Sequence, residues 1–166
     1  EDLSMELQAG HEGLGWLAKS GRLALGYLND EAKTKKTYPI VDGVRYVVPG
    51  DRARLTADMF IEVHGRDSVT INSGGEKIFA EEVEAAVKAH PDVYDCVVTG
   101  RPSERWGNEV VAVVRLKAGA TTSDAELREV AQQHIARFKL PKQFVFVDSI
   151  VRSPAGKADY RWAKQI

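Results

Sequence analysis

The chain has 166 residues, 43% of them hydrophobic, and a formal net charge of −1 at pH 7. This length allows one hydrophobic core, or one core with a small appendage. A charge near zero argues against a general nucleic-acid binder and against a protein drawn to acidic membranes. No apolar run is long enough to cross a bilayer, so we expect no transmembrane segment.

The cysteine content gives a hint about the compartment. Cys96 is the single cysteine, which excludes an intrachain disulfide and fits a reducing cytoplasm. It lies in the apolar run VYDCVVTG, and we expect its side chain to be buried. The chain starts at Glu1 without a methionine, and we expect it to be a piece of a longer protein.

Residues 1–65 are rich in glycine and in short β-like runs. Examples are VRYVV at 44–48 and MFIEV at 59–63, a pattern that predicts small strands joined by tight turns. The run NDEAKTKK at 29–36 predicts at most a short helical turn.

From residue 66 the pattern changes to alternating strands and amphipathic helices, which predicts a small α+β domain with helices packed on a mixed sheet. A capping box formed by Ser123 and Glu126 opens one helix, and His134 falls on the apolar face of that helix. The expected helices cover 80–90, 123–138 and 159–165, and the expected strands cover 69–72, 93–100, 109–116 and 142–148.

Two loops carry candidate chemistry. Pro154 and Gly156 in SPAGKADYR predict a turn with the ammonium group of Lys157 near its tip. Such a cation suits a phosphate or a developing oxyanion, although most exposed lysines are only solvated. Gly74 and Gly75 predict a loop between a strand and a helix. This loop is either a close approach of the backbone to a ligand or a plain strand–turn–helix joint.

Three long runs, in this order and spacing, resemble the C-terminal domain of the adenylate-forming superfamily. They are GRDSVTINSGGEKIFAEEVE, HPDVYDCVVTGRPSERWGNEVVAVV and FKLPKQFVFVDSIVRSPAGKADYR. The superfamily comprises acyl- and aryl-CoA synthetases, adenylation domains of nonribosomal peptide synthetases and firefly-type luciferases. The resemblance covers about residues 40–166, and INSGGEKIFAEEVE and RWGNEV look most like bacterial fatty-acid or steroid-type acyl-CoA ligases.

The resemblance implies an AMP-forming acid–thiol ligase of fatty-acid and lipid metabolism. A carboxylic acid, such as a fatty acid or a sterol side chain, would attack the α-phosphate of MgATP, and CoA would then displace AMP. Residues 1–65 would be the β-rich, barrel-like end of a large N-terminal domain, and residues 66–166 a mobile lid that rotates between the two steps. Magnesium would come with ATP and be held outside this chain, and we expect no metal ligands here.

The resemblance also assigns nucleotide contacts. Asp51 matches the aspartate that holds the ribose hydroxyls, although Pro49 stands where the family usually has threonine. Arg66 matches an arginine that contacts the nucleotide, and Lys157 matches the catalytic lysine of adenylation. The positive charge of Lys157 would bridge the attacking carboxylate and the α-phosphate.

A second set of residues is implied for CoA. Gly74 and Gly75 match the pantetheine tunnel, and Trp106 matches an aromatic residue near CoA in some relatives. Phe138 and Lys142 match positions that meet the CoA nucleotide, by stacking and by phosphate charge. Some relatives have a second basic residue where this chain has Leu140.

The hinge departs from the family pattern. Most relatives have Asp or Lys two residues after the arginine, whereas this chain has Ser68 preceded by Asp67, so either residue could be the pivot. Two alternatives to an acyl-CoA synthetase stay open: an adenylation domain that loads a carrier-protein phosphopantetheine, and a non-catalytic lid that binds nucleotide or partners. We expect these 166 residues alone to be catalytically inert, and the sequence does not indicate an oligomeric state.

Overall fold

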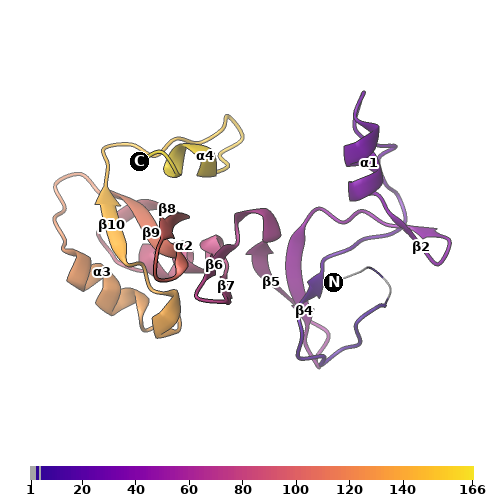
Figure 1. Ribbon diagram of the computed structural model, residues 1–166, viewed down its shortest axis with the longest axis horizontal. Coiled ribbons are helices and arrows are strands. Elements are labelled where there is room, and N and C mark those ends of the chain that lie inside the picture. Colours follow the sequence, from indigo (N-terminus) through magenta and orange to yellow (C-terminus); the bar gives the residue numbers. More distant parts are fainter. Residues whose placement is uncertain (1–2, 4) are drawn as a thin grey trace. The chain divides into compact units, whose positions relative to one another are not determined.

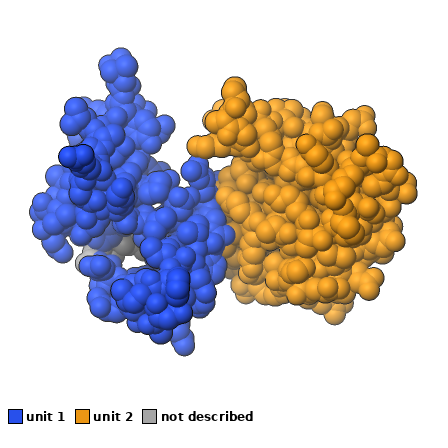
Figure 2. Space-filling model, turned by 180° about the vertical axis from the view of Figure 1, so that it is seen from behind, with its two compact units in different colours: residues 1–68 blue, residues 69–166 orange. Residues whose placement is uncertain are grey.

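A computed structural model of the chain describes residue 3 and residues 5–166. The chain forms two compact units that part after Ser68, shown in different colours in Figure 2. The elements of the first unit, named in Figure 1, are β1 Gly15–Trp16, α1 Glu31–Thr37, β2 Ile40–Val41, β3 Val44–Arg45, β4 Asp51–Leu55, β5 Ile61–Arg66 and the 3-10 turn Asp67–Val69, which crosses the boundary. Those of the second unit are β6 Ile71–Ser73, β7 Glu76–Ile78, α2 Ala80–Lys88, β8 Val93–Ser103, β9 Gly107–Leu116, α3 Asp124–Ala131, the 3-10 turn Arg137–Lys139, β10 Gln143–Phe146 and α4 Tyr160–Ala163.

The first unit is built from short strands, as expected from its glycine content. Three antiparallel strands form a sheet in the order β1-β4-β5, and β2 pairs with β3 as a separate hairpin. Within the described residues of this unit the sheet is open and does not close into a barrel. Helix α1 has seven residues and is capped at its N-terminus by Asp30, whose carboxylate accepts a hydrogen bond from the Lys33 backbone N–H at 2.9 Å.

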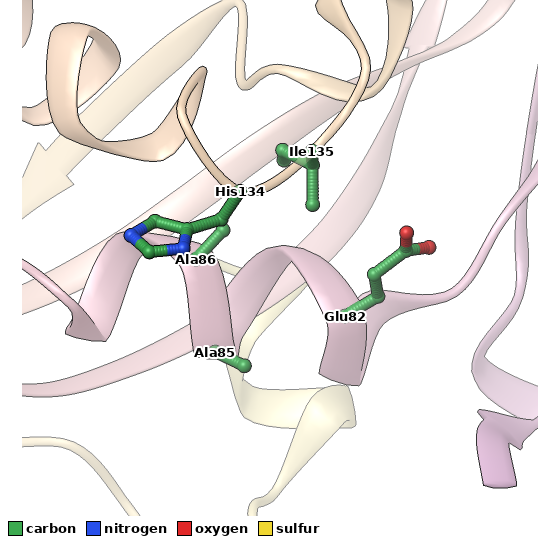
Figure 3. A pocket seen from close by; sticks show the side chains of 5 residues that line it. All are labelled: Glu82, Ala85, Ala86, His134 and Ile135. Atoms are coloured by element: carbon green, nitrogen blue, oxygen red, sulfur yellow. The ribbon is translucent and has the colours of Figure 1, made fainter. Parts of the chain in front are cut away.

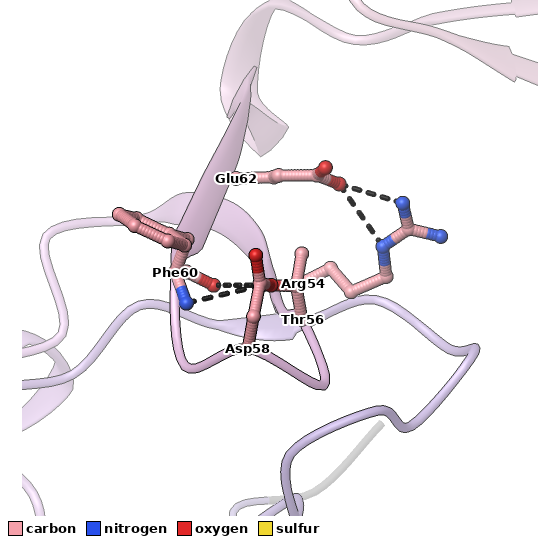
Figure 4. A network of polar contacts seen from close by, with 5 residues as sticks. All are labelled: Arg54, Thr56, Asp58, Phe60 and Glu62. Carbon is pink, nitrogen blue, oxygen red and sulfur yellow. Dashed lines mark hydrogen bonds and ion pairs between the residues drawn. The ribbon is translucent and has the colours of Figure 1, made fainter.

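The turn between β4 and β5 is held by side chains that follow each other closely in sequence (Figure 4). The Thr56 hydroxyl lies 2.6 Å from an oxygen of Asp58 and accepts a hydrogen bond from the Phe60 backbone N–H at 3.0 Å. On the strands themselves, Arg54 and Glu62 form an exposed ion pair at 2.6 Å. These local contacts fix the pairing of the two strands.

The second unit is built around a mixed sheet in the order β10-β9-β8 (Figure 1). β8 runs antiparallel to β9, and β10 runs parallel to it. One face of the sheet packs against α2 and α3, and the other packs against α4. Because both faces are covered, the valines of β8 and β9 form nearly continuous apolar runs instead of alternating with polar residues.

The structure differs from the expected elements at the glycine loop and at the C-terminal end of α3. Gly74 and Gly75 form the tip of a hairpin between β6 and β7, so a second strand separates the glycines from α2. Helix α3 ends at Ala131, which is earlier than the expected end at residue 138. As a result, His134, which was expected on the apolar face of this helix, lies in an exposed turn after it. Cys96 is fully buried, as expected.

A buried carboxylate ties α2 and α4 to the edge of the sheet. Glu84 on α2 is only 6% exposed. Its carboxylate accepts hydrogen bonds from the Val98 backbone N–H, at 2.9 Å, and from the Tyr160 hydroxyl. Burial raises the pKa of the Glu84 carboxyl, although the bond from Val98 partly offsets the shift.

Two substitutions of Glu84 should distinguish the effect of its negative charge on stability from the effect of its hydrogen bonds. A raised pKa means that the folded chain binds the proton more tightly, so ionisation lowers stability as the pH rises above 4.5, the ordinary value. We expect Glu84→Gln to be at least as stable as the wild type at about pH 7.5, and to lose that advantage towards about pH 4.5. Urea unfolding followed by circular dichroism measures both.

Glu84→Ala serves as the comparison. It leaves the buried Val98 N–H without this acceptor, and we expect a loss of about 1–3 kcal/mol in the free energy of unfolding. If Glu84→Gln and Glu84→Ala lost equal free energy of unfolding at neutral pH, the ionised carboxylate itself would be stabilising, and the prediction would be wrong.

Candidate functional site

Lys157 lies on a short hairpin-like loop between β10 and α4. Arg152 and Ala158 form an antiparallel bridge at its base. Across the loop, the Ser153 N–H donates to the Lys157 carbonyl at 2.9 Å, and the Lys157 N–H donates to the Ser153 hydroxyl at 3.2 Å. The Lys157 side chain is exposed, and its ammonium group has no hydrogen bond or ion pair within residue 3 and residues 5–166. The backbone is thus ordered while the cation remains available to a ligand.

An ion pair that sequence reasoning missed holds this loop to the sheet. Asp95 on β8 and Arg152 are 57 residues apart in the chain, and their shortest N–O distance is 2.6 Å. Burial alone would raise the pKa of the Asp95 carboxyl. Hydrogen bonds from Arg152 and from the Cys96 backbone outweigh that effect and lower it. In the sequence, only the strand position of Asp95 inside VYDCVV hinted at a partner, because a carboxylate on a buried strand needs one.

The two expected nucleotide residues of the first unit lie side by side. Asp51 begins β4 and Arg66 ends β5, and the strand register pairs them directly. The Arg66 Nε lies 3.2 Å from a carboxylate oxygen of Asp51. Both side chains are partly open to solvent, at 22% for Asp51 and 49% for Arg66. The pair therefore offers an acceptor and a donor at one end of the hairpin.

Both hinge candidates lie at the boundary of the units. Asp67 and Ser68 belong to the 3-10 turn that follows β5, and the first unit ends at Ser68. The Asp67 backbone N–H donates to the Gly50 carbonyl at 3.0 Å, which ties Asp67 to the first unit. Ser68 is exposed.

The expected CoA residues of the second unit fall into two groups, and Gly74, Gly75 and Trp106 form the first. Gly74 and Gly75 have φ of +59° and +89°, values that favour glycine in a two-residue hairpin turn. The Gly74 N–H donates to the Trp106 carbonyl at 2.9 Å. A Cβ at Gly74 would lie 2.9 Å from Cε3 of the Trp106 ring, whereas a Cβ at Gly75 would meet nothing within 4 Å. The β6–β7 tip and the β8–β9 tip are therefore in close contact.

Phe138 and Lys142 form the second group, around the 3-10 turn Arg137–Lys139. The Phe138 ring is 49% exposed, and the Lys142 side chain is exposed. Lys139 between them forms an ion pair with Glu82 of α2 at 2.7 Å, which anchors the turn. Leu140 is buried at 5% exposure, so this position packs in the core and does not face a ligand.

A shallow pocket of about 250 Å³ lies between α2 and the turn after α3 (Figure 3). Its lining residues are Glu82, Ala85, Ala86, His134 and Ile135, and none of them was a candidate from the sequence. No metal-binding group of three His, Cys, Asp or Glu side chains occurs among the described residues. In the same residues, no helix has the length and apolar character needed to cross a bilayer.

Comparison with known proteins gives a consistent result. Residues 82–157 match the AMP-binding enzyme C-terminal domain. Over 165 residues, 99% of its length, the chain is 64% identical to the medium-chain acyl-CoA ligase Mig from Mycobacterium avium, of which it covers 30%. It is 49% identical over 164 residues, 99% of its length, to the 3-oxocholest-4-en-26-oate–CoA ligase from Rhodococcus rhodochrous, and again covers 30% of that relative.

A solved structure agrees with these relatives. The o-succinylbenzoate CoA synthetase from Bacillus subtilis, in complex with its acyl-adenylate intermediate, superposes with a TM-score of 0.84 at 27% identity. The match covers 92% of this chain and 31% of that chain. The chain thus spans about 30% of the length of the curated relatives that it matches.

The contact between Gly74 and Trp106 predicts different outcomes for two neighbouring substitutions. Gly74→Ala and Gly75→Ala each place a side chain at positive φ, and we expect each to lose about 1 kcal/mol of stability. Only Gly74→Ala should displace the indole ring, because only its Cβ would overlap that ring. We expect it alone to change the near-UV circular dichroism of the tryptophans. The difference should vanish in a Trp106→Ala background, and equal spectra for the two single variants would contradict the contact.

Proposed function

We propose that this chain, which matches the C-terminal domain of AMP-binding enzymes over residues 82–157, forms the C-terminal part of an acyl-CoA synthetase. In the first step a carboxylate oxygen of the acid attacks the α-phosphorus of ATP, and pyrophosphate leaves. In the second step the CoA sulfur attacks the acyl carbonyl carbon, and AMP leaves. The observation that carries this proposal is the similarity to acyl-CoA ligases along 99% of the chain. It favours CoA over a carrier protein as the thiol.

The acid is proposed from the relatives. The names of the two curated relatives specify a medium-chain acyl group and a steroid side-chain carboxylate. We therefore propose a fatty acid or a sterol side-chain acid as the substrate. A reaction that consumes ATP and a free CoA thiol fits a reducing cytoplasm, which also suits the unpaired thiol of Cys96.

Lys157 is proposed as the adenylation lysine. Its ammonium group extends from a hydrogen-bonded loop, and no described residue neutralises it. Two anions must meet in this step, and a fixed cation between them offsets their repulsion and stabilises the charge that develops at phosphorus. The loop geometry gives the fixed position, and the long flexible side chain gives the reach.

Asp51 and Arg66 are proposed to hold the nucleotide. A carboxylate accepts hydrogen bonds from two vicinal ribose hydroxyls, and Asp51 is open enough to do so. Arg66 at 3.2 Å orients that carboxylate and supplies a donor for the nucleotide. Magnesium would come with ATP, and we propose that phosphate oxygens and residues outside this chain hold it.

The CoA face is proposed at the two hairpin tips of the second unit. The pantetheine arm would pass along Gly74 and Gly75, where the space beside Gly75 is open. Trp106, 39% exposed and packed against Gly74, would give the arm an apolar wall. Phe138 and Lys142 supply an exposed ring and an exposed cation for the CoA nucleotide. We propose that the lid begins near residue 66 and rotates about Asp67 or Ser68, close to the unit boundary after Ser68. The rotation would bring the CoA face to the bound substrate in place of the Lys157 loop.

Lys157→Ala in a full-length ligase that contains this chain tests the assignment. We expect ATP–pyrophosphate exchange with a fatty acid to fall by about 10²–10³-fold, because one transition-state charge contact is lost. Conversion of supplied acyl-adenylate and CoA to thioester should stay within about two-fold of the wild type, because that step does not use the lysine.

Lys164→Ala is the matched control, since it removes another exposed lysine of the same unit. It should leave both half-reactions unchanged. Wild-type exchange activity in Lys157→Ala would show that this lysine is an ordinary solvated surface residue, and would refute its catalytic role.

Asp51→Ala should act on binding and not on the chemical step. We expect the KM for ATP to rise by about ten-fold or more, since hydrogen bonds to a charged group contribute about 1.5–3 kcal/mol. Glu62→Ala is the control, because Glu62 is the other carboxylate of the β4–β5 hairpin that pairs with an arginine. Equal KM values for ATP in the two variants would count against Asp51 as a ribose ligand.

A further inference from the structure

The position of the Lys157 side chain depends on its backbone, because none of the described residues binds its ammonium group. The loop that carries it is short. The Gly156 N–H donates to the Ser153 carbonyl at 2.8 Å, and the Asp159 N–H donates to the Val151 carbonyl at 3.2 Å. These bonds fix the internal shape of the loop. They do not fix its orientation on the sheet.

The Arg152 guanidinium supplies that orientation with all three of its nitrogens. Its Nε donates to one carboxylate oxygen of Asp95 at 2.7 Å, and Nη2 donates to the other at 2.6 Å. Its Nη1 donates to the carbonyl of Gly156, the residue directly before Lys157, at 2.9 Å. One planar group therefore joins the peptide at the lysine to the sheet.

Asp95 is itself held in place. Its carboxylate accepts a further hydrogen bond from the Cys96 backbone N–H at 2.9 Å, on a strand that pairs with β9 on both sides of this position. The side chains of Asp95 and Arg152 are only 17% and 31% exposed, so solvent screens the pair less than an ordinary surface ion pair.

We propose that Asp95 and Arg152 are positioning residues that set the direction of Lys157 for the adenylation step. The inference rests on the proposed function of Lys157 and adds two residues that do not touch the substrate. Misplacement of a catalytic group by about 1 Å costs about 10²-fold in rate, so loss of the clamp should be visible in kcat.

The test uses Arg152→Lys and Asp95→Asn in the full-length ligase. Lysine keeps the charge but cannot bind Asp95 through two nitrogens and Gly156 through a third, and asparagine keeps the fold of the strand but presents a donor where Arg152 needs an acceptor. We expect ATP–pyrophosphate exchange to fall about 10–100-fold in kcat, while thioester formation from supplied acyl-adenylate stays within about two-fold. Arg54→Lys, which alters an exposed arginine–glutamate pair in the first unit, is the matched control and should change neither.

A second measurement separates positioning from general stability. In a Lys157→Ala background, Asp95→Asn and Arg152→Lys should change the remaining exchange activity by less than about two-fold, because they act only through the lysine. Additive losses in that background, equal losses in both half-reactions, or exchange within about two-fold of wild type in the single variants would each overturn the proposal. If Lys157→Ala itself retains exchange, the proposed role of Lys157 fails first, and the two failures are thereby distinguished.

Discussion

The antiparallel pairing of β8 with β9 is the constraint on which the functional parts of residues 69–166 depend. The pairing runs from Val93 opposite Leu116 to Ser103 opposite Gly107. Asp95 near one end holds the Lys157 loop, and the turn at the other end places Trp106 against Gly74. The eight residue-to-residue steps from Asp95 to Ser103 span about 26 Å of strand. The proposed adenylation and thioester groups are therefore kept well apart on one rigid ladder, as expected if the two steps use different parts of the unit.

At each of the two proposed sites, an ion pair sets the charge that the ligand meets. A lone carboxylate beside ATP would repel the triphosphate, and the ion pair of Asp51 with Arg66 offsets that repulsion while leaving oxygens for ribose hydroxyls. Near Lys157 the positive charge must stay unpaired, because a carboxylate bound to the ammonium group would cancel the attraction of that group for phosphate. There the carboxylate of Asp95 is bound by Arg152. Each proposed site thus has the net charge that its chemistry requires.

The sequence predicted the elements whose signals are local, and missed the contacts that link distant segments. The capping box of Ser123 and Glu126 marked the start of α3 correctly, because its donors and acceptors lie within four residues. The apolar spacing up to Ile135 extended that helix too far. Ile135 is indeed buried, but its side chain reaches the core from the turn after the helix. Its apolar character at helical spacing was therefore misread as a continuation of the helix. The Asp95–Arg152 pair spans 57 residues and has no periodic signal.

The carboxylates beside β8 have one more consequence. β8 is an edge strand, and its segment CVVTG is apolar, β-prone and uncharged. The N–H groups of Cys96 and Val98 are already bonded to Asp95 and Glu84, each at 2.9 Å. A second chain that approaches this edge therefore finds these two backbone donors already bonded. Asp95 and Glu84, which link other segments of the second unit to β8, thus also make this edge a poorer template for pairing with another chain.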